Sequence, residues 1–329
     1  MITKGILLVG NYYPSKGGIS ALIRNLAKGL SSDGYKVEIY SLSHGNIFKR
    51  IIKYLKLFFV IRRFEIIHAH GCSNLGQIPI IASYFLSVIL GKTFVVTFHG
   101  SIDNSTIVAN NLFFKRLMSK SVIVTTPSVI TAQSFRKVGY QTVYIPNIVE
   151  NDSWDFRKRD SISPKMICTR SKYNPKLVID TFIGVKKKYP DATLIMLGEF
   201  LDEKIQDYAS QFESIIIEGN VPRTEVYRYL NMSDIYINSC SNDSFGYSIY
   251  EALSVGLAVV SIESPSLRDS VGEEIIEFSF NTKTLETGVF NVLKNQSTTI
   301  QRIEKGYELY AMFTWNMLKK FWLDVYKIG

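Results

Sequence analysis

Cysteine is scarce in this chain of 329 residues, and long apolar runs are absent. The three cysteines, Cys72, Cys168 and Cys240, are far apart and form no C-x-x-C pair, so we expect neither a disulfide framework nor a structural metal site. No run reaches the roughly 18 residues needed to span a bilayer, and the longest, residues 78–90, predicts a buried helix. The N-terminus enters a strand pattern without the apolar core of a signal peptide, so we expect a cytoplasmic protein.

The overall composition describes a folded protein with a negatively charged partner. Hydrophobic residues make up 46% of the chain and charged residues 20%, and the length suffices for two domains with full cores. The net charge of +9 favours a nucleotide, a nucleic acid or an anionic membrane surface as the partner. A nucleic acid is the least expected of the three, because the positive charge is spread out and no aromatic and basic platform is evident.

Strand and helix patterns alternate in two series along the chain. The first series opens with a strand at residues 6–9, a helix from about Ile19 and a strand at residues 36–40, and the second restarts with a strand at residues 165–169. This alternation predicts the α/β class, with doubly wound parallel sheets whose ligands lie at the carboxyl ends of the strands. The charged, aperiodic stretch between the two series, residues 150–164, predicts a hinge.

Two loops of the first series are candidates for ligand contact. Gly17 and Gly18 precede a helix whose first amides favour an anion, although paired glycines are more often simple turn residues. His99 follows a predicted strand and would meet a ligand at the edge of the sheet, although a lone histidine is usually structural. His68 and His70 have no third metal ligand nearby, so we do not expect them to bind a metal.

A basic pair lies in the loop after the first strand of the second series. Arg170 offers a planar guanidinium and Lys176 a compact ammonium, two groups that can hold a diphosphate between them. The chain has 38 lysines and arginines, so a basic pair at one spacing is common. The argument for these two therefore depends on their position at the end of a strand.

The stretch at residues 243–261 has the composition of a phosphate site with an acid on either side. Asp243 precedes a Phe-Gly turn. Glu251 lies on a predicted helix, eight residues after Asp243. Gly246 allows the backbone to approach a ligand closely, and the amides of Tyr247 and Ser248 would be donors at the start of the helix. The alternative is that Asp243 caps the helix and Glu251 is a solvated helix residue.

Residues 45–63 combine apolar and basic residues without a single acid. On a helix, the apolar residues gather on one face and Lys49, Arg50, Lys53 and Lys56 lie along its edge. This composition is expected of a helix that lies against anionic lipid. An ordinary domain helix with a solvated basic face is the alternative, because most amphipathic helices face a core.

The order of these features resembles glycosyltransferase family 4 over nearly the whole chain. Five segments carry the resemblance: P-x-x-G-G ending at Gly18, V-V-T-F-H-G-S around His99, Pro146-Asn147, R-x5-K from Arg170 to Lys176, and acid-x7-acid from Asp243 to Glu251. Asp243 stands where the family has glutamate, and Leu177 stands where the family usually has glycine.

The resemblance implies a GT-B fold, in which two Rossmann-like α/β domains face a cleft. Residues 1–149 would form the acceptor-side domain, joined by a final helix at residues 314–329, and residues 150–313 would form the nucleotide-sugar-binding domain. The residues implied in catalysis are His99, Arg170, Lys176 and Asp243. The residues implied in donor binding are Gly17, Gly18, Arg170, Lys176, Gly198, Gly219, Asp243, Phe245, Gly246, Tyr247, Ser248 and Glu251.

The activity that the resemblance implies is retaining transfer of a sugar, of the hexosyltransferase class, from a nucleoside-diphosphate sugar. We expect a UDP-sugar rather than GDP-mannose, and a lipid-linked or glycan acceptor in cell-surface polysaccharide synthesis at the inner face of the membrane. No D-x-D sequence occurs, so we expect no metal and no other cofactor. Two alternatives stay open: a non-catalytic nucleotide-sugar-binding scaffold, because of Asp243 and Leu177, and a sugar-nucleotide epimerase on the same fold.

Overall fold

The computed structural model divides the chain into two compact units. The first unit comprises residues 1–150 and 313–329, and the second comprises residues 151–312. The structure describes residues 5–10, 12, 18–42, 46–71, 77–100, 122–149, 154–199, 202–243 and 245–327.

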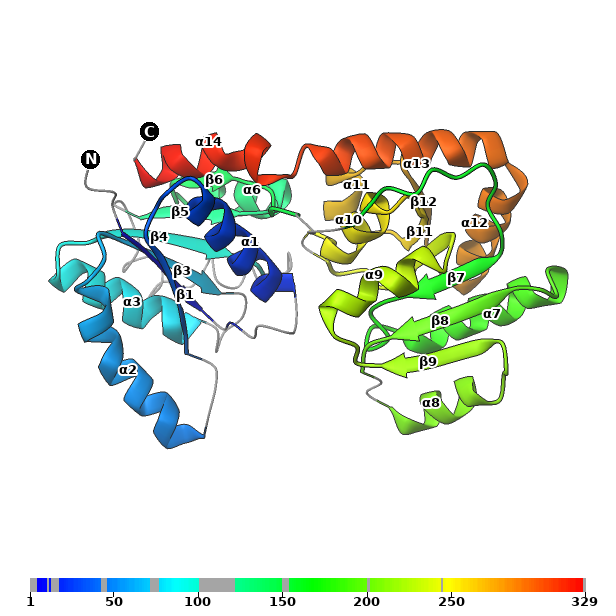
Figure 1. Ribbon diagram of the computed structural model, residues 1–329, viewed down its shortest axis with the longest axis horizontal. Helices are drawn as coiled ribbons and strands as arrows, with labels where there is room; N and C mark the ends of the chain where they lie inside the picture. Colours follow the sequence, from blue (N-terminus) through cyan, green and yellow to red (C-terminus); the bar gives the residue numbers. More distant parts are fainter. Residues whose placement is uncertain are drawn as a thin grey trace. The chain divides into compact units, whose positions relative to one another are not determined.

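The first unit is a six-stranded parallel sheet in the order β2-β1-β3-β4-β5-β6 (Figure 1). Its strands are β1 (Ile6–Gly10), β2 (Val37–Ser41), β3 (Ile66–Gly71), β4 (Thr93–Phe98), β5 (Ile123–Thr126) and β6 (Thr142–Tyr144). Its helices are α1 (Gly18–Ser32), α2 (Ile47–Ile61), α3 (Gln77–Ile89), α6 (Val129–Lys137) and α14 (Trp315–Tyr326).

The inner strands β1 and β3 are buried along their whole length, which fits the continuous apolar run of β1, whereas the edge strand β2 is half-buried. Alternate residues point to opposite faces of a strand, so Leu7 and Ile67 join the core cluster that includes residues of α2 and α3. His68 lies on the other face of β3, where its ring is 5.3 Å from the ring of Trp322 on α14. A Cβ added to Gly29 of α1 would lie 2.2 Å from the Trp315 ring, so α14 packs directly on α1.

The second unit is a six-stranded parallel sheet in the order β12-β11-β10-β7-β8-β9. Its strands are β7 (Lys165–Cys168), β8 (Thr193–Leu197), β9 (Ile215–Gly219), β10 (Ile235–Asn238), β11 (Ala258–Ile262) and β12 (Ile276–Ser279). Its helices are α7 (Pro175–Lys188), α8 (Glu203–Ser210), α9 (Arg223–Asn231), α10 (Tyr247–Ser254), α11 (Pro265–Ser270), α12 (Thr282–Lys294) and α13 (Gln296–Ala311).

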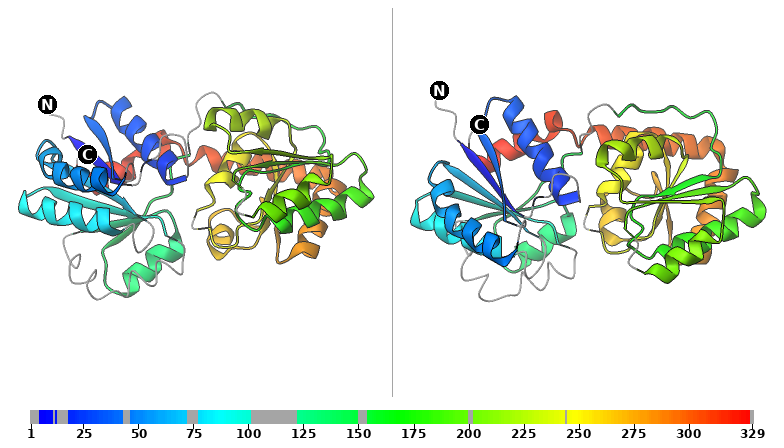
Figure 2. Two further views of the ribbon diagram at one scale, coloured as in Figure 1. Left: turned by 90° about the horizontal axis from the view of Figure 1, so that it is seen from below. Right: turned by 60° about the horizontal axis from the view of Figure 1, so that its bottom comes forward.

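Strand order in the second sheet reverses between β7 and β10, which are neighbours although three helices separate them in sequence. In open α/β sheets, ligands bind at the carboxyl ends of the strands at such a reversal. Helices cover both faces of this sheet (Figure 2). Leu177 and Phe182 of α7 pack with Leu285 and Val289 of α12 in one core cluster.

The stretch predicted as a hinge is packed against the second unit from residue 154 onward. Arg159 is buried, pairs with Asp234, and donates hydrogen bonds to the carbonyl oxygens of Gly256 at 2.9 Å and Ser233 at 2.8 Å. Burial, with a smaller effect from Arg157, lowers the pKa of Arg159 to about 10. A buried ion pair of this kind fixes the chain in place, so the prediction of a hinge over all of residues 150–164 is wrong for its described part.

Helix α3 was predicted to be buried, and the structure contradicts this. Ile78, Phe85, Val88 and Ile89 are all exposed, with exposed fractions of 44% to 71%. The helix still covers the core with its other side, where Ile80 and two serines are buried and Tyr84, Leu86 and Leu90 are partly buried. No helix in the described ranges is both long enough and apolar enough to cross a membrane.

Candidate active site

The predicted donor site of the second unit lies where its strand order reverses. β7 leads into the loop that carries Arg170, and its neighbour β10 leads into the loop that carries Asp243. The Ser239 hydroxyl donates a hydrogen bond to the carbonyl oxygen of Tyr173, which ties the two loops together. Side chains from two distant parts of the sequence therefore meet at one edge of the sheet.

Arg170 and Asp243 form an ion pair through Nη1 and Oδ2, so the structure brings these two predicted residues together. The guanidinium also lies over the Tyr173 ring, with Cζ 4.2 Å from the ring centroid. Burial alone would lower the pKa of Arg170, but Asp243, with smaller effects from Cys240, Tyr236 and Tyr173, more than offsets burial and the pKa is raised. The guanidinium is thus held as a permanent cation at the edge of the sheet.

Helix α10 begins at a glycine that no larger residue could replace without strain. Gly246 is the N-cap, with φ of +76°, and a Cβ there would lie 2.5 Å from Cδ2 of Leu267. The N-cap is Gly246, which makes no side-chain cap hydrogen bond, and among the described residues Asp243 pairs with Arg170, so the alternative in which Asp243 is the cap residue is wrong. The amides of Tyr247 and Ser248 are in the first turn, where a helix has no acceptor of its own, and an anion is favoured there.

Glu251 is buried with 6% of its surface exposed, so the alternative of a solvated helix residue is also wrong. It forms an ion pair with Arg223, the first residue of α9. The Arg223 guanidinium also lies over the ring of Tyr247, with Cζ 5.1 Å from the centroid. Burial alone would lower the pKa of Arg223, but Glu251 and Tyr247 raise it.

Arg223 was missed in the sequence analysis. The available signal was its position: Arg223 follows Pro222 at the start of α9, four residues after Gly219, the last residue of β9. Loops at strand ends in this fold carry ligand contacts, so each of their charged residues is a candidate.

Lys176 lies in the first turn of α7 and is paired with a different acid. Its Nζ donates a hydrogen bond of 2.6 Å to Oδ2 of Asp180, one helical turn further on, and this bond raises the pKa of Lys176. Asn174, the N-cap of α7, has φ of +47°, a left-handed conformation that asparagine tolerates better than most residues. The structure thus places Lys176 at the start of α7, just after the loop that carries Arg170, with an exposed side chain that can leave Asp180 for a ligand.

Two predicted glycines lie at the ends of β8 and β9. The amide of Gly198 donates a hydrogen bond of 2.6 Å to the carbonyl oxygen of Gly219. Both glycines have positive φ, and no atom lies within 4 Å of the position of a Cβ on Gly219. Phe245 stacks on Tyr250 with ring centroids 4.5 Å apart, so its ring supports the turn before α10.

In the first unit, the predicted His99 is the end of a chain of buried histidines. Nε2 of His99 lies 3.1 Å from Nδ1 of His70, and the His70 ring is 4.1 Å from the His68 ring. His68 is held by the Tyr326 hydroxyl at 2.8 Å and by Oγ1 of Thr97 at 2.6 Å.

The three imidazoles are held in the neutral form by their surroundings. Burial lowers the pKa of His99 to about 3. Burial, and then the charge of His99, lowers the pKa of His68 to about 3, and the pKa of His70 is also lowered well below its usual value by burial.

Of the two glycines predicted to contact the donor in the first unit, Gly18 is the first residue of α1, and Gly17 lies outside the described residues.

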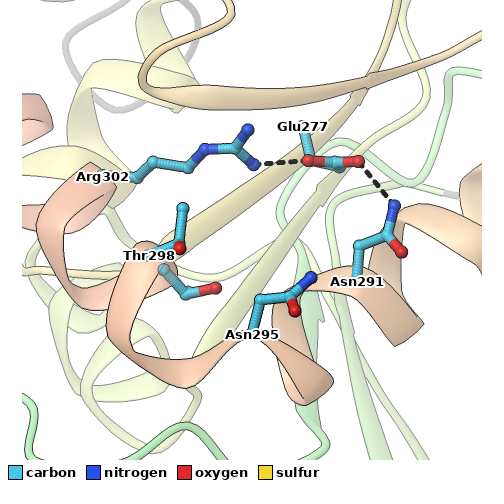
Figure 3. Close-up of a pocket in the computed structure, with 6 residues that line it drawn as sticks. Glu277, Asn291, Asn295, Thr298 and Arg302 are labelled. Carbon is cyan, nitrogen blue, oxygen red and sulfur yellow. Dashed lines mark hydrogen bonds and ion pairs between the residues drawn. The ribbon is translucent and has the colours of Figure 1, made fainter.

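Within the described ranges, no group of three histidine, cysteine, aspartate or glutamate residues could hold a metal ion. A hollow of about 280 Å³ occurs between β12, α12 and α13, and none of the predicted site residues line it (Figure 3). Glu277 pairs there with Arg302 and accepts a hydrogen bond of 2.9 Å from Asn291. These contacts join β12 to α12 and α13.

Comparison with known proteins gives one family match. Residues 153–309, nearly the whole second unit, match the family described as "Glycosyl transferases group 1". None of the curated proteins compared with the sequence matches it.

Solved structures resemble the chain over almost all of its length. HepE (Alr3699) from Anabaena, solved with UDP and glucose, is 14% identical with a TM-score of 0.71, and the match covers 98% of this chain and 99% of that one. A glycosyltransferase from Rickettsia africae is 17% identical with a TM-score of 0.74, covering 100% and 99%. A putative UDP-N-acetylglucosamine 2-epimerase from Listeria monocytogenes is 10% identical with a TM-score of 0.63, covering 94% of each chain. At these identities the likeness shows the fold, which is GT-B.

Proposed function

We propose that this glycosyltransferase with the GT-B fold is a retaining enzyme of the family 4 type that takes its sugar from UDP. The observation that carries the proposal is the meeting of Arg170, Asp243 and the start of α10 at the strand reversal of the second sheet. A cation, an acid and a helix N-terminus at one strand edge suit a sugar joined to a diphosphate.

In this proposal, the charge that builds on the departing diphosphate is stabilised by Arg170, Lys176 and the first amides of α10. These groups bind the leaving group more strongly as its charge grows, which lowers the barrier. The acceptor hydroxyl arrives on the face from which UDP departs, so the anomeric configuration is retained without a protein nucleophile. Two fixed cations and a helix dipole take the role of a metal, and we expect turnover in the presence of EDTA.

The remaining predicted residues are given roles by the same proposal. Asp243 contacts the donor sugar and Glu251 contacts the ribose, with Arg223 holding the Glu251 carboxylate in place. The ends of β8 and β9 at Gly198 and Gly219 leave room for the base. His99, in its neutral form, is the further residue that the proposal assigns to the donor sugar.

The acceptor in this proposal is a lipid-linked or growing glycan at the inner face of the membrane, in cell-surface polysaccharide synthesis. The support is the basic segment with Lys49, Arg50, Lys53 and Lys56, which would attract an anionic leaflet. Membrane attachment would keep the enzyme beside an acceptor that cannot leave the bilayer.

A sugar-nucleotide epimerase is the second candidate, favoured by the likeness to the Listeria protein. An epimerase would convert the donor without an acceptor, and a non-catalytic scaffold would bind UDP without releasing it from any donor. The family match over the second unit favours transfer.

The test is to incubate the purified protein with a panel of nucleotide sugars, a membrane lipid extract and EDTA, and to follow release of nucleoside diphosphate. We expect release from one UDP-sugar that depends on the lipid extract and is lost in Lys176→Ala. Lys187→Ala, on the exposed side of the same helix, is the matched control and should keep full activity. An anomeric configuration that is inverted in the product, by NMR, would overturn retention.

A further inference from the structure

Helix α2 carries large apolar side chains on the side that faces away from the core. Leu57 and Ile61 are buried in the core of the first unit. The opposite side presents a stripe of residues with exposed fractions of 48% to 72%: Phe48, Ile51, Ile52, Leu55 and Phe59. Since successive residues on a helix are about 100° apart, these positions fall on one face. A domain helix with a merely solvated basic face would not expose such a stripe, so that alternative for residues 45–63 fails.

Helix α3 also exposes large apolar side chains on the side that faces away from the core. Ser83 and Ser87 face the core, where the Ser87 hydroxyl donates a hydrogen bond of 2.6 Å to the carbonyl oxygen of Ser83. Phe85, Val88 and Ile89 point outward. Ile80 is buried in the core and Tyr84, Leu86 and Leu90 pack against it, so α3 covers the core with one apolar side and presents a second apolar side outward.

The two helices adjoin one another on the first unit (Figures 1 and 2). Nζ of Lys92, just after α3, donates a hydrogen bond of 3.2 Å to the carbonyl oxygen of Arg62, just after α2, which links their ends. We call the exposed apolar residues of the two helices, with the basic residues around them, the α2–α3 surface. Soluble proteins seldom expose so many large apolar residues together without a partner.

The charge around the α2–α3 surface has one sign. Residues 46–63 and 77–92 contain seven basic residues and no acid: Lys49, Arg50, Lys53, Lys56, Arg62, Arg63 and Lys92. Lys49, Arg50 and Lys56 of α2 are exposed and form no ion pair with any described residue, whereas Arg63, just after α2, lies 3.5 Å from the Glu38 carboxylate.

This charge decides between two occupants of the surface. A second copy of the chain would bring seven positive charges against seven more, which opposes association. An anionic bilayer offers negative headgroups to the basic residues and an apolar layer, just beneath them, to the side chains of Phe48, Leu55, Val88 and Ile89. Only the bilayer matches both parts of the surface.

We propose that the α2–α3 surface is a docking site for an anionic lipid bilayer, in which the exposed apolar residues of both helices enter the boundary between headgroups and acyl chains. This proposal deepens the proposed function. It rests on that function in one respect, which is that an enzyme with a lipid-linked acceptor needs to bind a bilayer. It adds two features to the electrostatic attraction by the four basic residues of α2. The first is a second helix, α3, and the second is an apolar contribution to membrane binding.

The test is co-sedimentation of the whole protein with phosphatidylcholine vesicles, with or without phosphatidylglycerol. Each basic residue near an anionic surface contributes about fivefold to the partition coefficient, so Lys49→Gln/Lys53→Gln/Lys56→Gln should weaken binding about 100-fold. The control Lys187→Gln/Lys294→Gln/Lys305→Gln removes the same charge from exposed helix positions of the second unit and should bind like the unaltered protein.

The apolar contribution is tested with net charge unchanged. Leu55→Gln/Val88→Gln should weaken vesicle binding about 10-fold or more, because each side chain loses its transfer into the apolar layer. Phe280→Gln, at a residue of the second unit that is 69% exposed, is the control and should have no effect.

Three results would overturn the proposal. The first is no binding of the unaltered protein to anionic vesicles, and the second is binding that depends on the lysines but is unchanged in Leu55→Gln/Val88→Gln. The third is a dimer, by light scattering, that the same double variant dissociates, which would assign the surface to a second copy. Calorimetric titration with UDP separates this inference from the proposed function: all these variants should bind UDP normally, and a failure of the unaltered protein to bind UDP would count against the proposed function alone.

Discussion

Replacing Arg223 with glutamine should loosen the buried Glu251 and weaken UDP binding together. Glu251 is 6% exposed, and Arg223 is the cation that pairs with its carboxylate. The variant leaves a carboxylate in a buried position without that cation, and it removes the guanidinium from the Tyr247 ring at the start of α10. Both losses fall on the helix that we propose holds the diphosphate and the ribose.

The expected cost follows from the burial of the two partners. Breaking a fully buried ion pair costs about 3–5 kcal/mol, because one charge is left without compensation. The Arg223 side chain keeps 23% of its surface exposed, so water can replace part of the lost interaction. We therefore expect the free energy of unfolding to fall by about 2 kcal/mol, toward the usual range for single substitutions.

A double-mutant cycle measures the pairing itself. Urea unfolding and calorimetric UDP titration would be carried out on Arg223→Gln, Glu251→Gln and the double variant. We expect the double variant to be more stable than the sum of the single losses predicts, with a coupling energy of about 1–3 kcal/mol. Losses that simply add, within about 0.5 kcal/mol, would refute the assignment of Arg223 as the residue that holds Glu251.

Three further predictions concern backbone geometry, helix packing and the buried histidines. Gly246→Ala should weaken UDP binding at least about tenfold, because alanine disfavours positive φ and its Cβ would meet Leu267; an unchanged Kd by calorimetry would contradict this. Gly29→Ala should lower the free energy of unfolding by about 1–3 kcal/mol, because the added Cβ would clash with Trp315. The control is Lys28→Ala, at the neighbouring exposed residue, which should change Tm little. Equal Tm values for both variants would show that α14 does not pack tightly on α1. The pKa of His68 is about 3 in the folded protein and about 6.5 in the unfolded protein, so below about pH 6.5 the unfolded state binds more protons. The free energy of unfolding should therefore fall by about 2 kcal/mol for this residue between pH 6.5 and 5. His68→Gln should make the free energy of unfolding less dependent on pH in this range, and an unaltered pH dependence would contradict the lowered pKa of His68.

The positions of the strands and of several candidate site residues could be predicted from the sequence, because they depend on local patterns. Buried parallel strands are continuous apolar runs, so their positions could be predicted to within a few residues. The final helix was predicted at residues 314–329, and α14 spans Trp315–Tyr326. Arg170 and Asp243 were predicted at strand ends, and parallel topology then brings the two loops to one edge.

The features that were missed depend on contacts between distant segments. The partner of Glu251 is determined by how α9 lies against α10, and no spacing in the sequence records that Arg223 reaches it. The face of α3 that meets the sheet carries serines, so a nearly uncharged apolar sequence predicted burial where the structure has exposure. Arg159 was assigned to a hinge because charged residues are usually solvated, whereas its carboxylate partner Asp234 lies 75 residues away.

The most direct test of the central claim is release of UDP from a panel of UDP-sugars and GDP-mannose, with lipid extract and EDTA present, by the unaltered protein and by Glu251→Ala. The account predicts release from one UDP-sugar, dependent on the lipid extract, and loss of release in the variant. UDP binding without release from any donor, or conversion of the donor sugar without an acceptor, would contradict it.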